Sequence, residues 1–252
     1  MSFDGDPMTS IQAEPDCEAD VHSGFVATGR HIVGLGGGGD TPEQTERLFD
    51  YVLGLTGKER PRLLIVPTAT AERDDDVAMY LERFARHTDP SVLRTFPWPP
   101  ADLRARILEQ DAIWVGGGNT ANMLAIWRVH GIDRLLHEAW EAGVVLFGAS
   151  AGMICWFEAG ITDSFGPQLE GLRDGLGMLA GSACPHYDGE ELRRPRYREL
   201  VDEGFPGGIA ADDGVGLHFD GTELVEIVTC RTGAAAYRVD VGGEEPLSAR
   251  EL

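Results

Sequence analysis

Short apolar runs alternate with amphipathic stretches from about residue 24 onward, and this alternation most constrains the fold. The five runs are His31–Leu35, Arg62–Pro67, Ser91–Phe96, Ala112–Val115 and Val144–Phe147. Several are apolar throughout, which is typical of strands covered on both faces. Strands separated by helices form a parallel sheet with helices on each side. The sequence therefore predicts an α/β fold, a three-layer α/β/α sandwich with a mostly parallel sheet.

Helix signals lie between these runs. Thr41-Pro42-Glu43-Gln44 combines a capping box with proline at the first helical position. Three consecutive acids, Asp74–Asp76, favour a helix beginning there, because carboxylates stabilise helix N-termini. Two more helices are expected over residues 120–130 and 133–142, each followed by a glycine stop signal.

After residue 205 the pattern changes to closely spaced strands. They are expected near Ile209–Ala211, Val215–Phe219, Glu223–Val228 and Ala235–Val241. Asp213-Gly214 and Asp220-Gly221 are turn signals, so these strands are predicted to extend one edge of the sheet in antiparallel fashion. With no repeat or composition break, residues 26–252 are predicted to form one domain. Residues 1–25 are expected to be a disordered acidic leader, since the first 23 residues hold six acids and no Lys or Arg.

Charge and cysteine usage narrow the partners and the compartment. The formal net charge is −21 and the pI is near 4.6, which argues against nucleic acid or an anionic membrane as the main partner. The four cysteines (Cys17, Cys155, Cys184 and Cys230) form no CxxC pair, so a reduced, cytoplasmic setting is expected. No apolar run is long enough to span a membrane, and the leader does not resemble a signal peptide.

The most informative segment is Val144–Ile154, which reads as a buried strand, then Gly148-Ala149-Ser150-Ala151-Gly152, then a helix. A nucleophile elbow needs this order, because its serine sits on a sharp turn that requires small neighbours. The backbone N–H of Ala151 would be the first oxyanion donor, helped by the positive end of the following helix. The bare pentapeptide is weak, and an ordinary glycine-rich strand–helix turn is the alternative.

A second oxyanion donor should come from a neighbouring strand end. The loop Gly116-Gly117-Gly118-Asn119-Thr120 follows the run Ala112–Val115 and begins a helix. Its glycines let the backbone approach a substrate closely, and Asn119 either caps the helix or faces the site. Gly117, Gly118 and Asn119 are therefore oxyanion or substrate-binding candidates, although such a loop is also a common strand–helix turn.

A nucleophilic serine also needs a base and an orienting acid. The downstream histidines are His186, just past a strand in Cys184-Pro185-His186-Tyr187, and His218, within the terminal strands. The acid candidates are Asp188, Glu190, Asp212 and Asp213. Either histidine could instead be structural, and Asp213-Gly214 could be a plain hairpin turn.

Four blocks together resemble the peptidase E family of serine peptidases, which includes aspartyl dipeptidases and cyanophycinases. They are Gly116–Thr120, Gly148–Gly152, Cys184–Tyr187 and Asp212-Asp213-Gly214, and the resemblance covers about residues 30–240. It implies a fold like that of class I glutamine amidotransferases, with serine in place of cysteine at the elbow. It also implies a small peptide substrate, no cofactor or metal, and a homodimer.

The resemblance assigns roles to individual residues. It implies Ser150 as nucleophile, His186 as general base, Asp213 as triad acid, and the N–H groups of Gly118 and Ala151 as oxyanion donors. The family commonly has Glu at the position of Asp213, so direct contact between Asp213 and the imidazole, or a role for Asp212, stays open. The implied activity is that of a dipeptidase, with N-terminal Asp preference a family expectation.

The same residues are compatible with other interpretations. An α/β-hydrolase would follow the order Ser150, Asp188, His218. An esterase, a cyanophycinase-like isopeptidase, a catalytically silent amidotransferase-like binding protein and a flavodoxin-like cofactor binder are the functional alternatives.

Several local signals favour simpler interpretations. Gly34–Gly39 matches GxGxxG, but the second strand ends without the acid of a dinucleotide site, so a glycine turn bordering the cleft is favoured. The acids around His186 do not form a metal cage. Cys155, five residues past Ser150, is expected to be a core thiol, and a nucleophilic role for Cys184, two residues before His186, is not favoured. Arg193, Arg194, Arg196 and Arg198 form either a paired helix face or a positive field for an acidic substrate.

Overall fold

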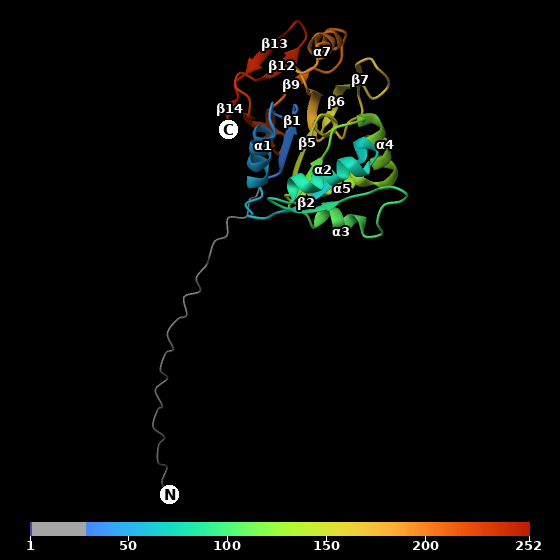
Figure 1. The fold of residues 1–252 in the computed structure, drawn as a ribbon, viewed down its shortest axis with the longest axis vertical. Helices are drawn as coiled ribbons and strands as arrows, with labels where there is room; N and C mark the ends of the chain where they lie inside the picture. The colour runs from blue at the N-terminus through green and yellow to red at the C-terminus, as the bar shows by residue number, and fades with distance from the viewer. Residues whose placement is uncertain (2–28) are drawn as a thin grey trace.

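The computed structural model describes residue 1 and residues 29–252. Apart from Met1, the leader expected over residues 1–25 lies outside the described residues. Within 29–252 the strands form two sheets, one of eight strands and one of six (Figure 1). The predicted α/β sandwich accounts for the larger sheet, and the smaller sheet is an addition.

The larger sheet has the strand order β14-β11-β10-β1-β5-β4-β2-β3. Its central part is parallel, from β1 through β5, β4 and β2 to β3, while β10 and β11 add antiparallel strands beside β1. In chain order the strands are β1 (His31–Leu35), β2 (Arg62–Val66), β3 (Asp89–Val92), β4 (Ala112–Val115), β5 (Val145–Ala149), β10 (Val215–Asp220), β11 (Glu223–Thr229) and β14 (Arg250–Glu251).

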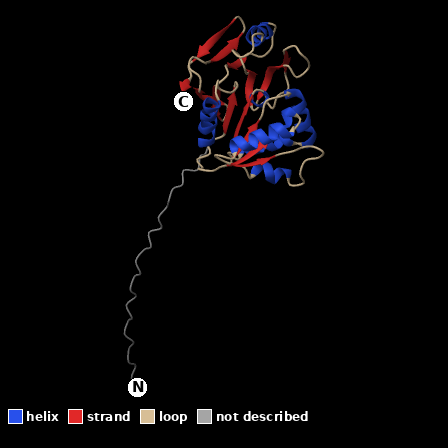
Figure 2. Ribbon diagram, viewed as in Figure 1, coloured by secondary structure: helices blue, strands red, loops and turns tan. Residues whose placement is uncertain are grey.

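Helices cover both faces of this sheet (Figure 2). They are α1 (Pro42–Gly54), the 3-10 helix η1 (Thr68–Thr70), α2 (Asp74–Phe84), α3 (Leu103–Leu108), α4 (Thr120–His130), α5 (Ile132–Glu141) and α6 (Ala151–Ile154), while α7 (Arg193–Asp202) packs on the smaller sheet. Ile32 packs in the core beneath α4 and α5, whereas the next residue, Val33, packs against α1. Because successive strand side chains point to opposite faces, these wholly apolar strands fill two cores at once.

Several elements have the bounds that the sequence predicts. β1, β4 and α4 agree residue for residue. The capping box of α1 is present: Gln44 N donates to Thr41 Oγ1 (3.3 Å), and Thr41 N donates to Gln44 Oε1 (3.1 Å). Strong local chemistry, whether an unbroken apolar run or a reciprocal cap, therefore fixed these boundaries.

The third predicted strand is shifted. It was expected over Ser91–Phe96, but β3 covers Asp89–Val92. The amides of Thr95 and Phe96 donate to the buried Glu72 carboxylate instead of a neighbouring strand. A side chain from a distant segment thus ends the strand, because it satisfies the backbone donors that would otherwise extend the ladder.

The smaller sheet corrects the prediction for the C-terminal strands. Its order is β13-β12-β9-β8-β6-β7, so the strands predicted at Ile209–Ala211 and Ala235–Val241 belong to it rather than to an edge of the larger sheet. Its strands are β6 (Phe157–Thr162), β7 (Glu170–Leu172), β8 (Leu179–Cys184), β9 (Gly208–Ala211), β12 (Ala236–Asp240) and β13 (Gly243–Leu247). It packs with α7 around a third core that contains Tyr187, Tyr197 and Val201.

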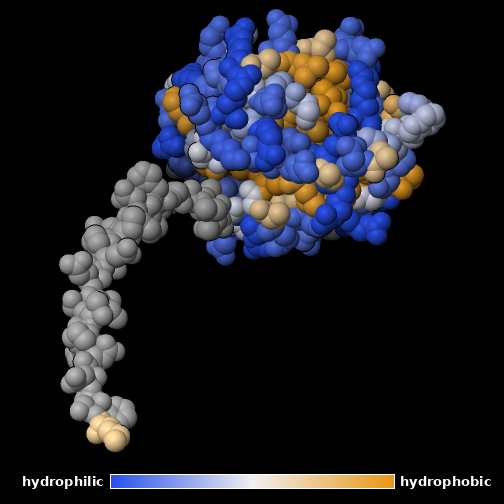
Figure 3. Space-filling view, turned by 90° about the horizontal axis from the view of Figure 1, so that it is seen from below, coloured by the Kyte–Doolittle hydropathy of each residue, from blue (hydrophilic) through white to orange (hydrophobic). Residues whose placement is uncertain are grey.

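The molecular surface is largely hydrophilic when viewed from below, with hydrophobic areas between the charged side chains (Figure 3). Large exposed apolar side chains include Phe96 and Trp98 in the segment after β3. Across the described residues, no helix combines the length and the apolar character needed to cross a membrane.

Candidate active site

Ser150 lies between the last residue of β5 and the first residue of α6, with φ 58° and ψ −114°. A non-glycine residue with positive φ is strained and persists only where its surroundings enforce it. A Cβ on Gly148 would lie 2.6 Å from the carbonyl oxygen of Val115, and one on Gly152 would lie 2.1 Å from the same atom. Both glycines of the pentapeptide are therefore required by close backbone packing. The predicted strand–turn–helix geometry is confirmed.

The helix after Ser150 is shorter than the elbow prediction assumed. α6 spans only Ala151–Ile154, which is a single turn. The electrostatic effect of a helix N-terminus arises largely from the free N–H groups of its first turn. The electrostatic contribution at this position therefore comes from individual N–H groups rather than from a long helix. The N–H of Ala151 makes no hydrogen bond within residues 29–252.

His186 and Asp213 form the central side-chain contact of the site. The distance between His186 Nδ1 and Asp213 Oδ1 is 2.6 Å, and both side chains are partly buried. An ionised carboxylate can only accept a hydrogen bond, so Nδ1 carries the proton and Nε2 is the basic nitrogen. His186 follows the end of β8 and has φ 54°, a second strained residue in the site. The prediction that a histidine emerges just past a strand is confirmed.

The glycine loop, Gly36–Gly39, follows β1 and brings the segments of the site together. Leu35, Gly36 and Gly37 each present a backbone carbonyl to a different segment of the site. The donors, in the same order, are the amides of Ser150 (3.3 Å), His186 (3.0 Å) and Gly214 (3.3 Å), the last next to Asp213. Three consecutive carbonyls thus fix the spacing of the three candidate triad segments.

The glycine loop tolerates no side chains at this point. A Cβ on Gly37 would lie 1.8 Å from Asp213 Oδ1 and 2.9 Å from His186 Nδ1. A Cβ on Gly36 would lie 2.2 Å from the carbonyl oxygen of Asp212. The favoured interpretation of Gly34–Gly39, a turn bordering the cleft, agrees with this placement.

The second glycine loop lies beside Ser150. A Cβ on Gly117 would be 3.2 Å from Ser150 Cβ and 3.7 Å from its Oγ. Gly118 has φ 131°, and Asn119 N donates to the carbonyl oxygen of Ala69 (2.8 Å), which ties the loop to η1. The N–H of Gly118 has no acceptor within the described part of the chain. The loop therefore presents a free donor near the elbow.

The Asn119 side chain serves the loop itself. Its Oδ1 accepts from Asn122 N (2.8 Å) and caps α4, and its Nδ2 donates to the carbonyl oxygen of Ser164 (3.0 Å). Ser164 Oγ in turn accepts from Ala121 N (3.2 Å). Of the two roles left open by the sequence, the structure shows the cap.

Asp212 and Asp213 follow β9 in the turn before β10, and their side chains have different hydrogen-bond partners. Asp212 is buried, its Oδ2 accepts from Ala235 N (2.9 Å), and burial raises the pKa of its carboxyl group. Its Oδ1 has no hydrogen-bond partner among the described residues. Of the two acids, only Asp213 contacts His186 directly. The alternative of Asp212 as the partner is therefore wrong.

His218 belongs to another part of the molecule. Its Nδ1 lies 2.7 Å from Tyr51 Oη and its Nε2 lies 3.0 Å from His31 Nδ1. Asp188, its partner in the α/β-hydrolase order, accepts from Asp213 N (2.8 Å) and from Arg231 Nη1 (2.8 Å). Both nitrogens of His218 are therefore occupied elsewhere, and the alternative order Ser150, Asp188, His218 does not form.

The described residues provide neither a reactive cysteine nor a cluster of metal ligands. Burial raises the pKa of the Cys184 thiol far above its usual range, so it stays protonated and is a poor nucleophile. Burial does the same to Cys155. Among residues 29–252, no cluster of three or more His, Cys, Asp or Glu side chains has the arrangement of a metal site.

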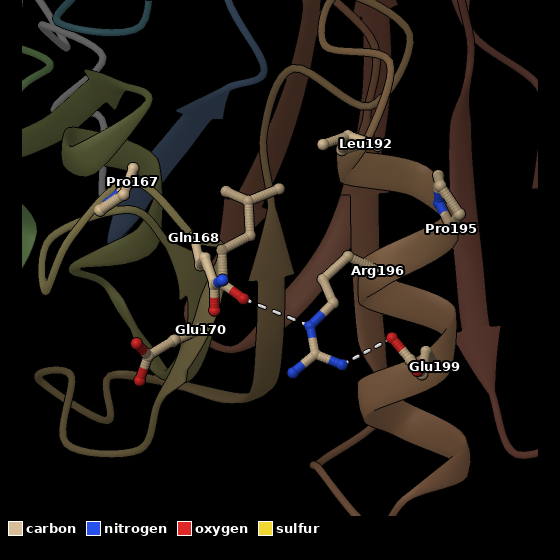
Figure 4. Close-up of a pocket in the computed structure, with 8 residues that line it drawn as sticks. Pro167, Gln168, Glu170, Leu192, Pro195, Arg196 and Glu199 are labelled. Atoms are coloured by element: carbon tan, nitrogen blue, oxygen red, sulfur yellow. Dashed lines mark hydrogen bonds and ion pairs between the residues drawn. The ribbon is translucent and has the colours of Figure 1, made fainter.

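The arginine cluster lies on α7 and beside a groove of about 860 Å³ between α7 and the segment before β7 (Figure 4). Arg196 spans this groove: its Nε donates to the carbonyl oxygen of Leu169 (3.3 Å) and its Nη1 to Glu199 (2.6 Å). Arg193 pairs with Glu190 (2.8 Å), and Arg194 pairs with Glu244. These three arginines are neutralised locally, which favours the paired helix face over a free positive field.

Arg231 was not recognised from the sequence. It lies in the segment between β11 and β12 and contacts Asp188 and the backbone of Asp213. It carries no local motif and is one of 20 arginines in the chain. Only the tertiary fold brings it to the site.

Comparisons with known proteins assign this chain to the peptidases. Residues 32–227 match the family described as Peptidase family S51. Because that match covers most of the chain, the protein belongs to peptidase family S51. The chain is 45% identical over 219 residues to the uncharacterized peptidase YgaJ of Bacillus subtilis (strain 168), covering 86% of this chain and 94% of the relative.

A more distant relative is also named a peptidase, and two solved structures show the same fold. Peptidase E of Streptomyces coelicolor is 27% identical over 222 residues, covering 79% of this chain and 86% of the relative. The crystal structure of a peptidase from an acI-B1 actinobacterium has a TM-score of 0.62 at 17% identity, covering 87% of this chain and 94% of that one. A putative peptidase E from Listeria monocytogenes EGD-e has a TM-score of 0.56 at 18% identity, covering 86% and 98%.

Proposed function

We propose that this family S51 peptidase is a serine-type enzyme that hydrolyses short peptides through an acyl-enzyme on Ser150. The observation that carries the proposal is the 2.6 Å contact between His186 Nδ1 and Asp213 Oδ1. It fixes the tautomer in which Nε2 is free to accept a proton. The carbonyls of Leu35 and Gly36, which bind the amides of Ser150 and His186, support a shared site.

In the proposed first step, Ser150 Oγ attacks the scissile carbonyl carbon while its proton moves to His186 Nε2. The negative charge that develops on the carbonyl oxygen is stabilised by the N–H groups of Gly118 and Ala151. The C–N bond then breaks, and the proton on Nε2 passes to the leaving amine. Asp213 stabilises the imidazolium throughout, without itself becoming protonated.

In the second step, a water molecule gives its proton to Nε2 and attacks the acyl carbon. The ester bond to Ser150 breaks, the proton returns to Oγ, and the carboxylic acid product leaves. Gly117 supports the site by leaving room beside Ser150, and Asn119 does so by holding the loop that carries Gly118. Apart from the attacking water, each proton donor and acceptor in these two steps belongs to the chain or to the substrate.

A dipeptide panel tests the proposal. Dipeptides with different N-terminal residues, including Asp, are incubated with the wild type and with Ser150→Ala. We expect turnover by the wild type and a loss of about 10⁴-fold or more in the variant, as for removal of a nucleophile that acts with its base as a unit. Ser91→Ala is the control, because Ser91 lies in the edge strand β3 and bonds Leu63 O (3.4 Å).

The panel also separates the competing activities. Turnover of N-terminal Asp dipeptides alone would establish the narrow preference that the family resemblance implies. Hydrolysis of esters but of no peptide would favour an esterase. Equal turnover by the wild type and Ser150→Ala would reject the serine mechanism.

A further inference from the structure

Both backbone polar groups of Asp213 are held by side chains from other parts of the chain. Its N–H donates to Asp188 Oδ1 (2.8 Å), and its carbonyl oxygen accepts from Arg231 Nη1 (2.8 Å). Neither bond is part of a strand ladder, because Asp213 lies in the turn between β9 and β10. The conformation of this residue thus depends on two specific side chains.

Arg231 connects those contacts to the rest of the site. Its Nη1 also donates to Asp188 Oδ2 (2.8 Å), and its Nε pairs with Asp40 (2.9 Å), which follows the glycine loop. One guanidinium therefore joins the glycine loop, the turn after His186 and the turn that carries Asp213. A planar guanidinium with several donors suits such a bridge better than an ammonium group does.

The position of Arg231 is itself fixed. Its N–H donates to the buried Thr229 Oγ1 (3.1 Å), and a Cβ on Gly214 would lie 2.7 Å from its Cγ and Cδ. Its side chain is only 23% exposed. The bridge is therefore built into the fold rather than being a mobile surface pair.

The carboxylate of Asp213 is closely packed against the backbone of two glycines, Gly37 and Gly189. A Cβ on Gly37 would lie 1.8 Å from its Oδ1, and one on Gly189 would lie 2.2 Å from its Oδ2. A small rotation of the turn would drive the carboxylate into one wall or draw it away from His186 Nδ1. A displacement of about 1 Å in a catalytic group can cost roughly 10²-fold in rate.

We propose that Arg231, acting through Asp188 and the backbone of Asp213, is a positioning residue that holds Asp213 in register with His186. The inference rests on the proposed serine mechanism. Residue 231 lies beyond the stretch 32–227 that matches the family, so the family match assigns it no role.

The first test replaces Arg231 with methionine, which preserves much of the stem but removes every donor. We expect kcat to fall about 10- to 100-fold while KM changes less than about threefold, because the proposed role of Arg231 is to position Asp213 rather than to bind the substrate. Arg231→Lys should recover part of the loss by restoring a cation. The matched control is Arg83→Met, since Arg83 is 29% exposed and pairs with Glu46 (3.3 Å) on α1.

A double-mutant cycle separates positioning from a general structural role. In an Asp213→Ala background there is no carboxylate to position, so Arg231→Met should lower kcat less than about threefold further. A purely structural role would multiply the two losses instead. Multiplicative losses, or a wild-type kcat in Arg231→Met, would overturn the inference.

The outcomes remain distinct from those of the proposed function. If Ser150→Ala keeps its turnover, the serine mechanism fails whatever Arg231 does. If Ser150→Ala is inactive while Arg231→Met behaves like Arg83→Met, only the positioning role fails.

Discussion

His186 and His218 each have a side-chain oxygen within hydrogen-bond distance of Nδ1, but the partners of their Nε2 atoms differ. His186 contacts the Asp213 carboxylate directly through Nδ1, and its Nε2 has no hydrogen-bond partner among the described residues. His218 contacts Tyr51 Oη through Nδ1 and His31 through Nε2. Tyr51 donates its own proton to Glu226 Oε2 (2.7 Å), so His218 Nδ1–H must donate to Tyr51.

The difference shows what makes a histidine available for catalysis. At His218 both ring nitrogens are used, and burial, followed by the nearby His31, lowers its pKa to about 4. It therefore stays neutral and structural at physiological pH. At His186 one nitrogen is oriented by an acid, and the other makes no hydrogen bond within the described residues. A free nitrogen, rather than an acidic neighbour alone, distinguishes the candidate base.

The largest expected difference comes from replacing each histidine in turn. His186→Ala should lower kcat by about 10⁴-fold or more, because the nucleophile loses its base. His218→Gln should leave kcat within about twofold, but lower the free energy of unfolding by about 1–3 kcal/mol as buried hydrogen bonds are lost. Steady-state kinetics and denaturant unfolding of both variants measure the pair. Equal kinetic losses would remove the distinction between the two sites.

The adjacent acids provide a sharper, smaller contrast. Asp213→Asn should lower kcat by about 10²- to 10⁴-fold, because the amide favours the wrong tautomer of His186. Asp212→Asn keeps an acceptor for Ala235 N and removes a buried carboxylate, so kcat should stay within about threefold. If the two variants lost activity equally, Asp213 would have no special role.

The smallest expected effect is the pH dependence that His218 gives to the free energy of unfolding. The folded pKa of His218, about 4, lies below its ordinary value of 6.5, so the unfolded chain binds more protons between these values. The contribution of this residue to the free energy of unfolding should therefore be complete above about pH 6.5. It should be lost as the pH drops toward 4, which lowers the free energy of unfolding by about 1–3 kcal/mol. Unfolding of the wild type and His218→Gln between pH 7.5 and 5 measures it. Identical pH slopes would contradict this contribution.

The parts of the fold that the sequence predicted are those encoded locally. β1, β4 and the elbow strand are apolar on both faces, and α1 carries its own cap. The smaller sheet has weaker signals: β7 has three residues, and β8 contains glycine and small side chains. The strands β9 and β12 were recognised as strands, but strand propensity does not say which sheet a strand joins.

The same limit applies to the site. Ser150 and His186 were found because each follows a recognisable strand, and the direct contact of Asp213 required the structure to decide between neighbours. Asp188 is an acid candidate by sequence, but in the structure it accepts a hydrogen bond from the amide of Asp213. Arg231 depends on a contact across 43 residues with Asp188, which no local pattern encodes.

Covalent labelling with a fluorophosphonate probe, with the modified residue located by mass spectrometry, tests the central claim most directly. A single adduct on Ser150 is expected in the wild type and in His218→Gln, with labelling slowed at least about 10²-fold in His186→Ala. An adduct on another residue, or an unchanged labelling rate in His186→Ala, would contradict the account.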